Sequence, residues 1–213
     1  MVTDILLKKI SVVENGELAK GREAANLLGI ETWPEEIAKL SGLKTLRLRD
    51  GETIDLARPD RVTGKPFNEK QRLLIRRELL APVHLTVALA TIDNPPAFEK
   101  FLTNLLGAAF KIGWSNLVSG VGASLIAVVA GVHLDSITCA KHSYIIGEGD
   151  CLLDPATLQS GIITVPLFVP KDVVRIATHF PSPGRPPERY PVTVLKADST
   201  TPNAKVELQV QVY

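Results

Sequence analysis

In the first half of the chain, apolar side chains recur at the three- and four-residue spacing that is typical of amphipathic helices. Gly29 and Gly42 stand where the first two of these patterns end, as helix stops often do. Asn68 is placed to cap a third helix. The spacing therefore predicts four helices, at residues 17–29, 32–41, 69–80 and 95–111.

Between these helices, shorter segments favour extended structure. Residues 1–16 are apolar enough for a strand or a short helix and end at the turn-forming pair Asn15-Gly16. Residues 43–50 alternate leucine with polar side chains. They precede a second turn, Asp50-Gly51, so we expect residues 52–59 to pair back on them as a β-hairpin.

After residue 82 the pattern changes to alternation, which indicates strands. In the last strand Val206, Leu208, Val210 and Val212 take inward positions, and the glycine-rich segment 147–150 is predicted to be a turn. Pro166 favours a strand at the edge of its sheet. The predicted strands are residues 83–92, 136–146, 161–169, 172–180 (a strand or a short helix), and 191–197 paired with 204–213.

Together these elements predict an α+β protein with a helix-rich N-terminal half and an antiparallel β-sheet or sandwich in the C-terminal half. Residues 57–67 are rich in proline, glycine and charge. We therefore expect a small N-terminal α/β module at 1–57, a linker at 58–67, and a main α+β domain at 68–213 with a β-rich C-terminal half.

The longest uncharged run covers residues 112–134, between Lys111 and Asp135. Such a run either lies in a core or enters lipid. Its serines and glycines divide it, so we expect residues 112–119 to continue the preceding helix and 124–134 to form a buried strand. The alternative is a membrane segment, in which residues 95–146 insert into the bilayer.

Composition narrows the range of partners. The 24 basic and 23 acidic residues give a net charge of +1, and aromatic residues make up 5% of the chain. Neither the basic excess nor the stacking platforms of a nucleic-acid-binding protein are present. The N-terminal segment lacks the features of a signal peptide, so a cytoplasmic location is expected. No motif identifies a cofactor or a small-molecule substrate.

Four side chains of metal-binding type lie within a short part of the chain. They are His133, Cys139, His142 and Cys151. Their spacing differs from that of zinc fingers and ribbons, and along one strand His142 would face away from His133 and Cys139. Buried thiols and ordinary strand histidines are the alternative interpretation, and no metal is expected.

Cys151 is also a weak candidate for a catalytic nucleophile, with His142 or His179 as its base. The surrounding segment GEGDCLL resembles the segment around the nucleophile of ovarian-tumour-type cysteine proteases. That resemblance implies that Cys151 begins a helix, whose dipole would lower the pKa of its thiol. Here Asp154-Pro155 would end such a helix almost at once.

The sequence thus predicts a non-catalytic structural, assembly or adaptor protein that acts through protein–protein contacts or self-association. Strands 161–169 and 204–213 would offer edges for pairing, and loops 57–67 and 181–191 would be exposed. The first alternative is a membrane-active protein that uses residues 95–146. The second is a cysteine- or metal-dependent enzyme.

Overall fold

The computed structural model of the chain describes residues 2–16, 18, 23–32, 39–59, 64–91, 144–181 and 185–213. These residues form antiparallel strands and one short helix, α1 (Glu69–Arg72). The strands are β1 (Val2–Val12), β2 (Glu23–Thr32), β3 (Lys39–Leu48), β4 (Thr53–Asp55), β5 (Leu73–Glu78), β6 (Val83–Thr91), β7 (Tyr144–Leu153), β8 (Gly161–Leu167), β9 (Val173–His179), β10 (Glu188–Leu195) and β11 (Ala204–Val212).

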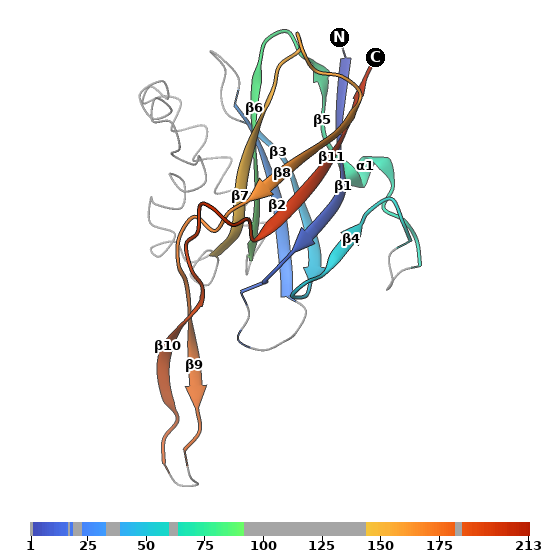
Figure 1. Ribbon diagram of the computed structural model, residues 1–213. Helices are drawn as coiled ribbons and strands as arrows, with labels where there is room; N and C mark the ends of the chain where they lie inside the picture. Colours follow the sequence, from blue (N-terminus) through green and yellow to red (C-terminus); the bar gives the residue numbers. More distant parts are fainter. Residues whose placement is uncertain are drawn as a thin grey trace.

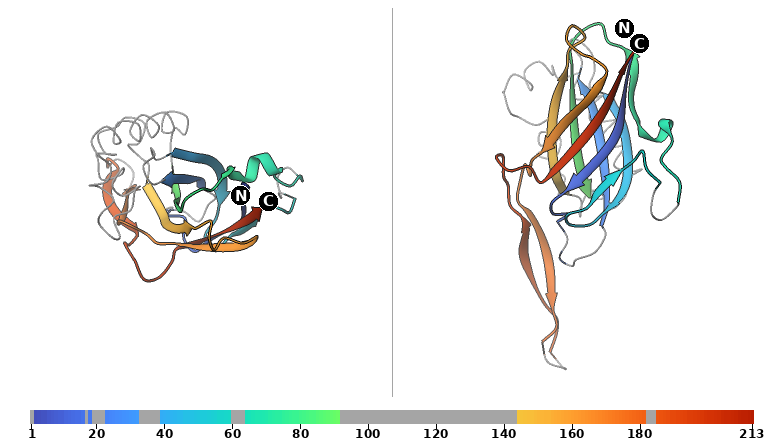
Figure 2. Two further views of the ribbon diagram at one scale, coloured as in Figure 1. Left: turned by 90° about the horizontal axis from the view of Figure 1, so that it is seen from above. Right: turned by 45° about the vertical axis from the view of Figure 1, so that its right-hand side comes forward.

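Two sheets form a sandwich (Figures 1 and 2). Sheet A has the order β4-β1-β11-β8, and β5 pairs with the other end of β1. Sheet B has the order β3-β2-β6-β7. The remaining described strands, β9 and β10, pair with each other and with no other described strand, and they extend from one end of the sandwich as a separate hairpin (Figure 1).

The core lies between the two sheets, and it follows from alternation along the strands. In β11, Val206, Leu208 and Val210 are buried, as the sequence predicts. They belong to the same hydrophobic core as Val83, Leu85, Val87 and Leu89 of β6, which are also buried. Burying one such side chain contributes about 1.5–3 kcal/mol, so this shared core stabilises the packing of the two sheets.

The sheets also join directly along one side, where β7 crosses the end of β8. The N–H of Glu148 donates to the carbonyl oxygen of Phe168 (2.8 Å), and the N–H of Phe168 donates back to Glu148 (2.8 Å). Glycine makes this crossing feasible. A Cβ on Gly149 would overlap the carbonyl oxygen of Pro166, and one on Gly147 would lie 2.9 Å from the Cβ of Leu167.

A buried amide fastens three further segments together. The side chain of Asn203 donates to the carbonyl oxygens of Glu14 (2.8 Å) and Ile146 (2.7 Å), and it accepts from the N–H of Glu14 (3.1 Å). These bonds tie the start of β11 to the end of β1 and to β7. Buried polar groups that are satisfied in this way contribute about 1 kcal/mol each.

The prediction of an α+β fold with a helix-rich N-terminal half is wrong. Residues 23–32 and 39–48, predicted largely as two helices and a following strand, form β2 and β3. Gly29 and Gly42 are not helix stops but lie opposite each other within these paired strands. Because β2 pairs with β3 on one side and with β6 on the other, long-range hydrogen bonds override the local helical spacing.

The third predicted helix, residues 69–80, is confirmed only at its start. Its first turn is α1, and the rest of the segment becomes β5, which pairs with β1. Two predicted hairpins are also wrong in their partners. β4 pairs with β1 rather than with β3, and β10 pairs with β9 while β11 lies between β1 and β8.

Several predicted strands are confirmed. They are β1, the second half of β3, β6, β8 and β9, and Pro166 lies in β8 at the edge of sheet A, as expected. The predicted turn at 147–150 is instead the middle of β7, because its glycines are used where β7 crosses β8. Each sheet contains strands from before and from after residues 58–67. The predicted division of the chain into two domains at this linker stays a prediction.

The predicted helix at 95–111 and the run at 112–134 lie outside the described residues. The membrane segment expected at 95–146 also falls almost entirely outside them. Among the residues that are described, no helix has the length and hydropathy needed to cross a bilayer. That finding does not extend to residues 92–143, so membrane insertion by residues 95–146 stays a prediction.

Candidate interaction surface

The β9–β10 hairpin is an insertion in sheet A. β8 and β11 are adjacent antiparallel strands, with Leu167 paired to Ala204 where the hairpin leaves and returns. From this point the hairpin extends away from the sandwich, and its tip is the part of the described chain farthest from the termini (Figures 1 and 2). No second layer of described strands covers the faces of this two-stranded hairpin, so exposed side chains on it are available for contact.

The base of the hairpin is fixed to the sandwich. Val173 and Leu195 pair with each other at the start of the hairpin and are both buried in the core. The Asp172 carboxylate accepts from the N–H of Ala197 (2.7 Å), and the N–H of Asp198 donates to the carbonyl oxygen of Val169 (3.0 Å). The hairpin therefore projects from an anchored base.

The turn that follows the hairpin is also held by hydrogen bonds. The Asp198 carboxylate accepts from the hydroxyl and the N–H of Thr200 (2.7 Å each) and from the N–H of Thr201 (3.1 Å). The hydrogen bonds from Thr200, then that from Thr201, lower the pKa of Asp198 well below its ordinary value. This turn directs the chain from the hairpin into β11.

One face of the hairpin is exposed along its whole length. Residues that pair directly across an antiparallel ladder point to the same face. The pairing places Val174 opposite Thr193 and Ile176 opposite Pro191, and Val174 and Ile176 are 53% and 59% exposed. We call this surface the hairpin face; it consists of Val174, Ile176, Thr178, Arg189, Pro191 and Thr193, all exposed.

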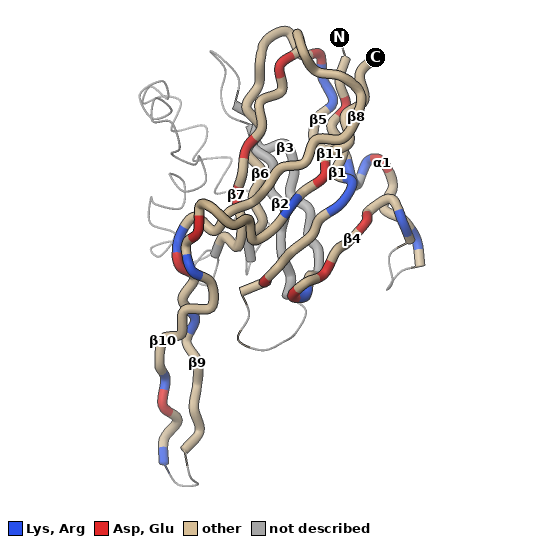
Figure 3. The backbone as a smooth tube through the Cα atoms, in the orientation of Figure 1, with Lys and Arg blue, Asp and Glu red and all other residues tan. Residues whose placement is uncertain are grey.

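The hairpin is basic as well as apolar. Residues 170–197 contain five basic and two acidic residues, a formal charge of +3, although the whole chain carries only +1. Basic residues occur from the base of the hairpin to its tip (Figure 3). Phe180, beyond the end of β9, is 76% exposed. The hairpin thus combines exposed apolar side chains with positive charge.

Cys151, the predicted nucleophile, lies in β7 rather than at the start of a helix. It pairs with Leu85, faces the interior of the sandwich, and carries a free thiol. Burial, and then the negative charge of Asp150, raise the pKa of this thiol to about 12. The reactive thiolate is therefore disfavoured, which opposes a catalytic role.

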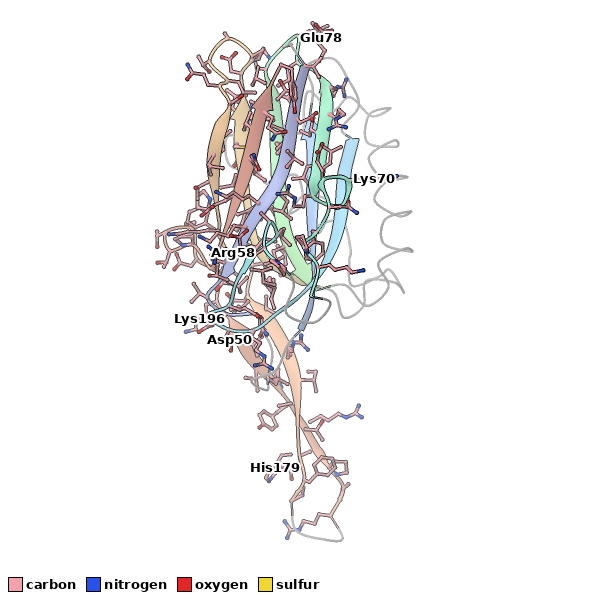
Figure 4. All side chains as sticks on the ribbon, turned by 90° about the vertical axis from the view of Figure 1, so that its right-hand side faces the viewer. Asp50, Arg58, Lys70, Glu78, His179 and Lys196 are labelled. Atoms are coloured by element: carbon pink, nitrogen blue, oxygen red, sulfur yellow. The ribbon has the colours of Figure 1, made fainter. Side chains whose placement is uncertain are left out.

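Among the described residues, His179 is the one other candidate site residue, and it does not lie near Cys151. His179 lies at the end of β9, far along the hairpin (Figure 4), whereas Cys151 is within the sandwich. His133, Cys139 and His142 lie outside the described residues. In the part of the chain that the structure describes, no group of three or more His, Cys, Asp or Glu side chains could hold a metal ion.

Glu148 is an unusual position that the sequence pattern did not indicate. Its side chain is only 7% exposed, although it lies on the face of sheet B that is turned away from sheet A, opposite Ala88. Its Oε2 atom is buried and has no hydrogen-bond partner among the described residues. Burial, and then the charge of Asp150, raise the pKa of Glu148 to about 8.

Sequence reasoning also missed the hairpin face, although a local signal was present. Val174, Ile176 and Thr178 alternate with Arg175, Ala177 and His179, between two proline-containing segments. That alternation predicts a strand but does not say which layer covers it. The structure shows that the face is exposed, because among the described strands β9 pairs with β10 and with no other.

No protein-family model, curated protein or solved structure matches this chain.

Proposed function

We propose that this chain is a non-catalytic assembly or adaptor protein, and that the hairpin face is the surface with which it contacts a partner protein. The observation that carries the proposal is the exposure of Val174 and Ile176 on a hairpin that extends beyond both sheets. Burying the exposed part of each side chain would contribute about 1 kcal/mol to a complex. Basic residues around them would favour an acidic partner surface.

The arrangement of the strands adds a second mode of contact. Among the described strands, β9 and β10 pair only with each other, so each has one edge to which no other described strand is paired. β10 contains Pro191, which lacks an N–H, whereas β9 contains no proline. The edge of β9 is therefore the better template for pairing with a strand of the partner.

The sequence also predicted free strand edges at residues 161–169 and 204–213, which can be compared with the edge of β9. β8 lies at the edge of sheet A, but β11 is paired on both sides, so the expectation of a free edge at 204–213 is wrong. The exposed loops expected at 57–67 and 181–191 include described residues such as Arg58 and Arg185 that are exposed. Of these segments, 181–191 belongs to the hairpin.

Site-specific photo-crosslinking tests the proposal. A photo-crosslinking amino acid replaces Ile176 in the full chain, expressed in its native cells. We expect one crosslinked protein of defined mass, which is then purified and shown to bind the unmodified chain directly. Binding should fall at least about tenfold for the Val174→Asn/Ile176→Asn double variant, because the apolar contact is lost.

The matched control places the same photo-crosslinking group at Thr164, an exposed position of β8 away from the hairpin. This control should give no adduct of the same mass. The absence of any specific adduct from position 176, or equal binding by the double variant and the unmodified chain, would remove the hairpin face as the contact surface.

A further inference from the structure

The end of the sandwich opposite the hairpin has complementary properties. It is formed by the β5–β6 and β7–β8 connections with the adjoining strand ends, residues 77–82 and 150–162 (Figures 1 and 2). We call it the distal end. Glu78 marks it in Figure 4, where His179 marks the hairpin at the other end of the molecule.

The distal end exposes apolar side chains from three segments. Leu80, in the β5–β6 connection, is 81% exposed. Leu152 at the end of β7 and Ile162 at the start of β8 are also exposed. Leu80, Leu152 and Ile162 thus supply apolar surface at this end of the sandwich.

The charge of the distal end is opposite to that of the hairpin. Residues 77–82 and 150–162 contain three acidic residues, Glu78, Asp150 and Asp154, and one basic residue, Arg77. The hairpin segment 170–197 carries +3. Opposite charge around two apolar surfaces favours their association and steers it into one orientation.

From this complementarity we propose that the partner of the hairpin is a second copy of this chain, and that copies associate head to tail, with the hairpin face of one on the distal end of the next. This inference rests on the proposed contact role of the hairpin face. Because the two surfaces lie at opposite ends of the molecule, each copy keeps one surface free after pairing (Figure 4). Such heterologous contacts produce rings or open chains of copies.

A two-fold dimer formed by two hairpin faces is less favourable. It would place two segments of charge +3 side by side. The hairpin face covers five residues of β9, from Val174 to Thr178, so it is about 17 Å long and about 10 Å wide. An interface of this size lies below the range for stable protein complexes, so association should be weak and concentration-dependent.

Light scattering after size-exclusion chromatography tests the inference with full-length chains. The unmodified protein should rise above the monomer mass between about 5 and about 500 µM, as expected for a small interface. Val174→Asn/Ile176→Asn removes the apolar hairpin contact without changing charge. Leu80→Lys places a positive charge on the distal end, against the basic hairpin. Each variant alone should stay monomeric.

The decisive sample is an equimolar mixture of the two variants. The Leu80→Lys copy still has an intact hairpin, and the Val174→Asn/Ile176→Asn copy still has an intact distal end. The mixture should therefore form one-to-one dimers that grow no further. Thr164→Asn, on exposed β8, is the matched control and should assemble like the unmodified chain. Circular dichroism of each variant verifies its fold.

Three results would overturn head-to-tail association. They are an unmodified chain that is monomeric over the whole range, a variant that assembles alone, and a mixture that stays monomeric. None of them removes the contact role of the hairpin, because a different protein crosslinked at position 176 would still support it. The contact role of the hairpin is removed only by its own test, which is the absence of a specific adduct at position 176 or equal partner binding by the double variant.

Discussion

Gly149 lies where a strand of one sheet crosses a strand of the other, and the absence of a side chain there is a structural requirement. It faces the interior of the sandwich, opposite Val87. The space that a Cβ would take is occupied by the backbone carbonyl of Pro166, with Val165 Cγ1 a further 3.2 Å contact. A backbone atom cannot turn aside as a flexible side chain can, so the strands themselves would have to separate.

Gly149→Ala should therefore lower the free energy of unfolding by about 2 kcal/mol or more, because β7 and β8 must move apart. Urea-induced unfolding measures this change. Gly161→Ala is the matched control, since nothing lies within 4 Å of a Cβ at that position. It should change stability by less than about 0.5 kcal/mol. Equal effects of the two substitutions would show that the crossing is not tight.

At the scale of single residues, a glycine in the sequence predicts only the local backbone conformation. Gly16 and Gly51 adopt positive φ angles of 75° and 67°, as expected for the predicted turns at Asn15-Gly16 and Asp50-Gly51. The glycines at 147 and 149 led to a predicted turn, although they lie inside β7. Glycine is suited both to a turn and to a close approach of two backbones, and the neighbouring residues do not distinguish these uses.

At the scale of the secondary-structure elements, the β9–β10 hairpin differs from the other described strand pairs because it belongs to neither sheet A nor sheet B. Only its base contributes to the core, through Val173 and Leu195. The strands β2 and β3, in contrast, are extended because of the strands that pair with them. Their helical spacing was misleading because β6 supplies a pairing partner that is distant in the chain.

The hairpin can therefore be shortened without loss of the sandwich. Replacing residues 175–192 by Asn-Gly joins the paired residues Val174 and Thr193 through a turn suited to two-residue hairpins. Because Val173 and Leu195 remain, the melting temperature should change by less than about 5 °C. Calorimetry measures it. A loss of cooperative unfolding would contradict this expectation and show that the whole hairpin supports the core.

The whole molecule should respond to pH through Glu148. The folded state raises the pKa of this carboxyl from 4.5 to about 8, mainly by burial. Above pH 4.5 the unfolded chain loses this proton while the folded chain keeps it, so folding becomes less favourable as pH rises. This loss continues up to about pH 8, where the folded state also releases the proton.

Glu148→Gln should remove this pH dependence, because glutamine has a similar shape and does not ionise. At pH 8 the variant should be more stable than the unmodified protein by about 2–4 kcal/mol, as a shift of this size implies. Below about pH 4.5 the two proteins should agree, which serves as the internal control. Urea unfolding across this pH range measures the difference, and parallel profiles would contradict the assignment.

The sequence by itself determined the features that depend on neighbouring residues. These are the alternation of β6 and β11, the edge position of Pro166 in β8, and the turns at Gly16 and Gly51. It also identified the proline-rich segment that became part of the hairpin. Such features follow from side-chain periodicity and backbone preference, which each segment carries wherever it lies.

Only the tertiary structure decided which strands pair, and with that the fold class and the candidate surface. β1 pairs with β11 at the other end of the chain, β2 becomes a strand because β6 lies beside it, and β9–β10 is left outside both sheets. The burial of Glu148 and the requirement for glycine at position 149 arise in the same way. Each depends on hydrogen bonds and contacts between distant segments, which no local pattern contains.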